Sequence, residues 1–263
     1  MSVRDKCELN YREYGSGDPL IILHGLLGAG DNWHSIARGL EDQFRVLTVD
    51  QRNHGASPWT EGMEYPSQAG DVLELMDSLS LQGSFLLGHS MGGKTAMECA
   101  LSFPDRVRGL IIVDIAPIAY VPRHREMIEA LLDLDVSMIK KRSEADDLLA
   151  GRIEERMLRL FLLKNLKRRD DGSFKWGINL PGIVADYESI WAGIDGGRRY
   201  EGPVLFIAGG NGGYLKPEDR EPILDRFPLA EFITFEQAGH WVHVDKPERF
   251  IDTVRHFFHT PDQ

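Results

Sequence analysis

The sequence predicts an α/β fold, in which a mostly parallel central sheet carries helices on both faces and receives a helical insertion. Short apolar runs alternate with amphipathic helical patterns, an order typical of parallel sheets. The runs are continuously apolar, as in strands that are buried on both faces. Residues 117–200 interrupt this order, because they contain helical patterns and no such run.

Six apolar runs are expected to form the strands. In chain order they are "PLIILHG", "FRVLTVD", "GSFLLGHS", "VRGLIIVDIAP", "GPVLFIAGG" and "AEFITFEQAGH". The third run ends on Ser90, the fourth on Asp114, and the sixth near His240. In α/β sheets the active-site groups gather at the carboxyl ends of the strands, so these three side chains should lie close together.

Three helices are expected around these strands. The first covers residues 67–79, and the second covers residues 91–103, where Pro104 stops it. A last helix can be capped by Asp245, with Glu248 three residues later. The inner face of that helix should consist of Phe250, Val254 and Phe257.

The interrupting segment is predicted to be a helical lid. The stretches "REMIEALLDL" and "EADDLLAGRIEERMLRLFLLKNL" show helical spacing, and a structureless loop of this length is uncommon in a compact domain. The chain of 263 residues then divides into a core, residues 1–116 and 201–263, and a lid, residues 117–200. One apolar stripe of the lid should consist of Leu149, Ile153, Met157 and Leu160.

Composition argues against several classes of protein. A net charge of −11 disfavours nucleic-acid binding, which needs a basic surface. No apolar run approaches the roughly 20 residues that span a bilayer, and the start "MSVRDKCELNYREYG" lacks the apolar core of a secretion signal. Two cysteines make no disulfide framework, so we expect a cytoplasmic location. The histidines lack metal-ligand spacing, so no metal is expected.

Ser90 is the candidate nucleophile, because "GHSMG" fits the pattern G-x-S-x-G between a strand and a helix. This pattern produces a sharp turn that exposes the serine hydroxyl. Side chains at Gly88 and Gly92 would collide with the neighbouring backbone. The amide of Met91, at the start of the helix, is free to donate a hydrogen bond to a developing oxyanion.

A serine hydroxyl needs a base, and the base should follow a later strand. His240 in "EQAGHWVH" fits this position, and His243 is the competing candidate. The base in turn needs a carboxylate that fixes its tautomer. Asp114 is favoured, because it ends the strand that should neighbour the strand of Ser90. Asp219 is the alternative, in the loop "AGGNGGYLKPEDR" where such an acid usually lies.

The loop "HGLLGAGDNW" after the first core strand should supply the second oxyanion donor. We expect the amide of Leu26, with Leu27 as the alternative, and a structural role for His24. The segment "DQRNHGAS" is interpreted as a self-bonded turn that braces the active-site loops, in preference to a substrate contact.

The motifs "HGLLG…DNW", "VDQRNHGAS", "GHSMGGK", "VDIAP" and "GHWVH" resemble the α/β-hydrolase superfamily over essentially the whole chain. More narrowly, they resemble its bacterial acyl-esterase and acyl-CoA thioesterase branch, which has a mitochondrial abhydrolase relative. The resemblance implies Ser90, Asp114 and His240 as nucleophile, acid and base. It also implies hydrolysis of short acyl esters or thioesters without a cofactor.

The leading functional hypothesis is therefore a serine hydrolase that acts on a small-molecule ester or thioester. A lyase or carbon–carbon bond hydrolase on the same scaffold is one alternative, and a non-catalytic binding protein is another. His89 and Trp241 are candidate substrate contacts. The basic residues Lys167 and Arg168 would either end a solvated helix or contact the phosphates of coenzyme A.

Overall fold

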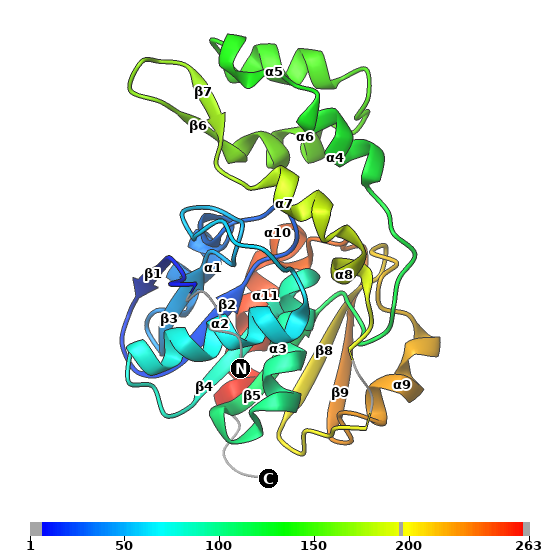
Figure 1. Ribbon diagram of the computed structural model, residues 1–263. Helices are drawn as coiled ribbons and strands as arrows, with labels where there is room; N and C mark the ends of the chain where they lie inside the picture. The colour runs from blue at the N-terminus through cyan, green and yellow to red at the C-terminus, as the bar shows by residue number, and fades with distance from the viewer. Residues whose placement is uncertain (1–6, 195–196, 260–263) are drawn as a thin grey trace.

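The computed structural model describes residues 7–194 and 197–259. Residues 1–6, on which part of the expectation about a secretion signal rests, lie outside the described residues. The core is a seven-stranded sheet in the order β1-β3-β2-β4-β5-β8-β9 (Figure 1). Its strands are β1 Tyr11–Tyr14, β2 Asp18–Leu23, β3 Phe44–Val49, β4 Ser84–His89, β5 Val107–Val113, β8 Val204–Gly209 and β9 Ala230–Phe235.

All six predicted strands are confirmed, and they pair in parallel as β2 to β5, β8 and β9. Both faces of such a sheet are covered by helices, so its strands are continuously apolar. The short edge strand β1 was not predicted. It pairs antiparallel with β3, and its polar sequence "YREY" is half exposed.

Helices cover both faces of the sheet, as expected. The core helices are α1 His34–Leu40, α2 Tyr65–Ser78, α3 Met91–Ser102, α9 Arg220–Leu224, α10 Val242–Asp245 and α11 Pro247–His259. Figure 1 shows α2 and α3 on one face and α11 on the other. Two apolar clusters fill the two sides of the sheet, one with α2 and α3 and the other with α1 and α11. The expected helices over residues 67–79 and 91–103 correspond to α2 and α3.

The prediction for the last helix was partly wrong. Asp245 ends the short helix α10, and its carboxylate accepts a hydrogen bond from the Gly239 amide at 2.7 Å. It therefore shapes the loop before His240. On α11, Phe250 and Val254 are fully buried as predicted, Phe257 is partly buried against the same apolar cluster, and Phe258, which was not predicted, is also buried there.

Further helices and strands, between residues 117 and 194, lie at one end of the sheet (Figure 1). They comprise α4 Arg125–Leu132, α5 Arg142–Leu149, α6 Arg156–Leu162, β6 Leu166–Arg168, β7 Phe174–Trp176, α7 Leu180–Ala185 and α8 Tyr187–Trp191, with short 3₁₀ turns between them. Within the described ranges, no helix is long and apolar enough to cross a membrane.

Two local predictions for this segment were wrong. Lys167 and Arg168 lie on β6, in a hairpin with β7, and do not end a helix. The stripe is also broken, since α5 stops at Leu149 and the exposed Met157 lies on α6. The chain turns between these helices because the buried Arg159 guanidinium donates to the carbonyls of residues 153 and 154 and to Asp146.

The turn that carries Ser90 is held by close packing at two glycines. A Cβ atom at Gly88 would lie 2.2 Å from the carbonyl oxygen of Gly92. At Gly92 it would lie 2.3 Å from the carbonyl oxygen of Leu23, at the end of β2. Both neighbours are backbone atoms, so the expected collisions are confirmed.

Gly92→Ala should destabilise the protein by about 1–3 kcal/mol or more, because the backbone of β2 and α3 must separate. Gly151→Ala is the matched control, since a methyl group added there would meet no atom within 4 Å. The control should be neutral or slightly stabilising. Urea unfolding of both variants measures the difference, and equal stabilities would contradict the packing argument.

Candidate active site

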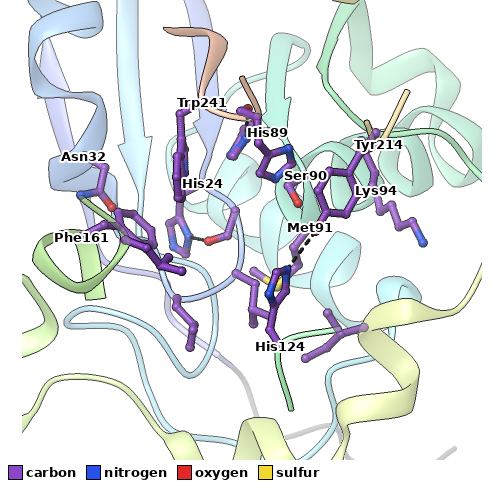
Figure 2. Close-up of a pocket in the computed structure, with 18 of the residues that line it drawn as sticks. His24, Asn32, His89, Ser90, Met91, Lys94, His124, Phe161, Tyr214 and Trp241 are labelled. Carbon is purple, nitrogen blue, oxygen red and sulfur yellow. Dashed lines mark hydrogen bonds between the residues drawn. The ribbon is translucent and has the colours of Figure 1, made fainter. Parts of the chain in front are cut away.

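Ser90 lies at the sharp turn between β4 and α3. Its backbone has φ 52° and ψ −117°, a strained conformation for a residue with a side chain. The Ser90 amide is fixed by donating to the carbonyl of Val113 at 3.1 Å. Ser90 lines a cavity of about 250 Å³, and Figure 2 shows it among the lining side chains. The turn therefore presents the serine to a pocket.

His240 and Asp114 form a hydrogen-bonded pair at the carboxyl ends of the strands. The Nδ1 atom of His240 lies 2.8 Å from Oδ2 of Asp114. The other oxygen, Oδ1, accepts from the Gly209 amide at 3.1 Å. An imidazole that donates from Nδ1 keeps Nε2 as its free acceptor, and this is the form a general base requires. His240 lines the same cavity as Ser90.

Burial governs the ionisation of this pair. Burial raises the pKa of the Asp114 carboxyl. Hydrogen bonds from the amides of Gly209 and Leu215 lower that pKa, but their effect is smaller. Burial also lowers the pKa of His240, and the neighbouring His124 lowers it further. A charged imidazole is therefore disfavoured at rest, and the ring is available to accept a proton.

The alternative acid lies elsewhere. Asp219 is buried at the end of a 3₁₀ turn, Pro217–Asp219, and its carboxylate accepts from the Lys216 amide at 2.8 Å. The alternative base, His243, also lines the cavity but is stacked on Trp33, with ring centroids 3.9 Å apart. The structure therefore brings Asp114 to His240 and leaves Asp219 in a local cap.

The glycine-rich loop after β8 has a geometric explanation. A Cβ atom at Gly212 would lie only 2.2 Å from Oδ2 of Asp114. The Asp114 carboxylate itself therefore occupies the space beside this loop, where the acid of such a site usually lies. The sequence "GGNGG" therefore makes room for an acid that directly follows β5.

The candidate oxyanion donors differ in availability. The amide of Leu27 donates to Nε2 of His54 at 3.1 Å and is occupied. In the hydrogen bonds of the described residues, the amides of Leu26 and Met91 have no acceptor. Both residues line the cavity, and Met91 is the first residue of α3. This favours Leu26 over Leu27.

Buried polar residues brace these loops as expected. His24 contacts the carbonyl of Gly25 through Nδ1 at 2.8 Å and accepts from the Gln51 amide through Nε2 at 3.0 Å. In the turn after β3, Asp50 accepts from the Gly30 amide at 2.7 Å. Burial lowers the pKa of His24, so the ring is neutral and can act as both donor and acceptor.

The cavity wall is largely apolar. It includes the candidate contacts His89 and Trp241, and the Trp241 ring lies 5.3 Å from that of Phe161. Tyr214 also lines the cavity and was not predicted; its ring centroid lies 4.3 Å from that of His240. The sequence feature that could have indicated Tyr214 is its place at the end of "GGNGGY", in a loop that follows a core strand. The apolar lining also includes Leu26, Leu27, Met91, Ile115, Met127, Leu158, Leu162, Ile190 and Trp191.

The two basic candidates have different positions. Lys167 lines a second cavity, of about 600 Å³, which shares Asn32 and Phe161 with the first. Arg168 is exposed, lies over the Phe174 ring and donates to the carbonyls of Gly172 and residue 140. Arg168 lines neither cavity.

Comparison with known proteins shows similarity over nearly the whole chain. The chain is 39% identical over 250 residues to the sn-1-specific diacylglycerol lipase ABHD11 of Danio rerio, covering 91% of this chain and 78% of that protein. It is 34% identical to Esterase YbfF of Escherichia coli, covering 92% and 93%. A solved marine microorganism esterase is 43% identical, with a TM-score of 0.93 and coverage of 95% and 99%.

The family model described as the alpha/beta hydrolase fold matches residues 18–247. That range contains the whole strand series from β2 to β9 and the three residues gathered at its edge. The chain belongs to the alpha/beta hydrolase fold family.

Proposed function

We propose that the protein is a serine hydrolase that cleaves carboxylic esters or thioesters of short acyl chains. The observation that carries this proposal is the His240–Asp114 hydrogen bond of 2.8 Å beside the strained turn of Ser90. The names of the relatives, which include a lipase and an esterase, support the same reaction class.

In the proposed mechanism the Ser90 hydroxyl attacks the acyl carbon while Nε2 of His240 takes its proton. Asp114 stabilises the resulting imidazolium. The amides of Leu26 and Met91 donate to the oxyanion of the tetrahedral intermediate. The imidazolium then protonates the leaving alcohol or thiol, and an acyl-serine remains. Water attacks this ester with the same histidine as base, which releases the acid and regenerates Ser90.

The cavity supports a small apolar acyl group, because about 250 Å³ lies below the usual range of ligand pockets, about 300–1,000 Å³. The second cavity supports thioesters as further substrates. Its basic lining is Arg142, Arg156, Lys164 and Lys167, and these side chains could contact an anionic leaving group such as coenzyme A. Lys167 belongs to this proposed contact surface, and Arg168, which does not line the cavity, does not.

Ser90→Ala should abolish hydrolysis of p-nitrophenyl esters without unfolding the protein, because it removes the nucleophile and little packing. Labelling by a fluorophosphonate should disappear together with activity. Circular dichroism checks that the variant is folded. A folded variant that keeps substantial activity would mean that Ser90 is not the nucleophile, and it would favour a proton-transfer or binding role for the site.

Asp114→Asn should lower kcat by orders of magnitude, about 10⁴-fold in the comparable protease triad, since His240 loses the partner that fixes its tautomer. Asp219→Asn is the control, because that carboxylate serves a local cap. Steady-state kinetics on one ester compare the two. The reverse ranking would transfer the acid to the loop after β8.

The pH dependence of kcat/KM should reflect the buried pair. Asp114 and His240 together carry one buried negative charge at high pH, and burial raises the pKa of the carboxyl above its ordinary 3.8. As pH falls, the pair therefore binds the proton that inactivates it at a higher pH than an exposed aspartate would. The acid limb should therefore have its midpoint well above the ordinary 3.8 of an aspartate carboxyl. Full activity down to pH 4, in a protein that remains folded, would show that amide donors outweigh burial.

A further inference from the structure

Lys94 is a buried cation that the proposed mechanism does not use. It lies on α3, where its amide donates to the carbonyl of Ser90 at 3.1 Å, so it is one helical turn beyond the nucleophile. The residue is 1% exposed. None of the ion pairs between described residues includes Lys94. Burial lowers the pKa of the Lys94 ammonium to about 7.

Two backbone carbonyls receive the Lys94 ammonium. Its Nζ atom donates to Ile118 at 2.9 Å and to Ala192 at 2.5 Å. The same atom lies 4.9 Å from the ring centroid of Tyr120 and 5.5 Å from that of Tyr65. In Figure 2 the side chain extends away from Ser90, past Tyr214. A buried ammonium is costly unless it is hydrogen-bonded, so this position requires both carbonyls.

The carbonyls of Ile118 and Ala192 belong to two stretches near the two ends of the segment 117–200. We call these stretches, residues 117–120 and residues 190–194, the lid roots. The roots are hydrogen-bonded to each other, from the Tyr120 amide to the carbonyl of Trp191 at 2.9 Å and from the Ile194 amide to that of Pro117 at 3.0 Å. A Cβ atom at Gly193 would lie 3.0 Å from the amide nitrogen of Ala119, so the roots pack closely.

The lid roots also form part of the catalytic cavity. Tyr120, Ile190 and Trp191 line it, and so does Lys94 itself. The Tyr120 hydroxyl donates to the carbonyl of Tyr214 at 2.5 Å, and the Tyr214 ring packs on His240. A shift of the roots would therefore move the wall that faces an acyl chain while leaving the Ser90 turn in place.

We propose that Lys94 is a positioning residue that ties both lid roots to the helix of the nucleophile and thereby sets which acyl chains the cavity accepts. The inference rests on the proposed ester hydrolysis. It concerns selectivity and not the chemical step, because no contact of Lys94 reaches Ser90 beyond the helical backbone bond.

The test compares Lys94→Met, Lys94→Arg and wild type on p-nitrophenyl acetate and p-nitrophenyl octanoate, with rates normalised to sites labelled by a fluorophosphonate. Lys94→Met should change the octanoate-to-acetate ratio of kcat/KM by about tenfold or more, because both hydrogen bonds from the ammonium to the lid roots are lost. The change should appear mainly in KM for octanoate and less in kcat. Lys94→Arg should restore part of the ratio, because it keeps a cation.

Lys140→Met is the matched control, the same change at an exposed lysine of the segment, and its ratio should equal that of wild type. Hydrogen exchange at the Tyr120 and Ile194 amides should accelerate in Lys94→Met only. If that variant does not fold, Gly193→Ala separates the roots instead and should shift the same ratio. An unchanged ratio in a folded variant, or equal losses on both esters, overturns the inference. A wild type that is neither labelled nor active on either ester overturns the proposed function instead.

Discussion

The buried carboxylate of Asp114 is the constraint on which the arrangement of this site depends. A fully buried charge must be satisfied, and here the Gly209 amide and the His240 ring do so. These partners come from the ends of two further strands, β8 and β9. Asp114 itself adopts φ 47°, a conformation that is unfavourable for an aspartate. The hydrogen bonds hold that strained backbone, and they fix the loop of His240 against the end of β5.

Much of the core could be predicted from the sequence because its strands are buried on both faces. Short continuous apolar runs such as "LIIV" are typical of strands in a parallel sheet, and the ends of these runs placed Ser90, Asp114 and His240 at one edge. The choice of acid depended on position alone: Asp114 directly follows a strand, whereas Asp219 lies several residues into a loop. Gly212, which makes room for that carboxylate, acquires its meaning only in three dimensions.

The segment 117–200 was less predictable because its contacts are not periodic. A helical stripe was expected, but Arg159 satisfies backbone carbonyls at the turn between α5 and α6, so Met157 and Leu160 face outward. The hairpin of β6 and β7 has strands of three residues each, too short for an alternating pattern to emerge. Lys94 was visible in "GHSMGGK", but its carbonyl partners lie 24 and 98 residues further along the chain.

The histidines of this site show why spacing alone does not identify a base. His24, His54 and His89 are all buried, His24 and His89 line the same cavity as His240, and the His54 ring lies against that of His24. Burial lowers the pKa of His54 to about 3, so the neutral ring accepts from the Leu27 amide while its Nδ1 faces the carbonyl of residue 52. His89 donates to the carbonyl of His240 at 2.9 Å. These three rings meet backbone groups, whereas His240 contacts a carboxylate. In His24 and His54 both ring nitrogens meet backbone groups, so these rings can only brace a loop, whereas a ring that pairs one nitrogen with a carboxylate keeps the other for a proton.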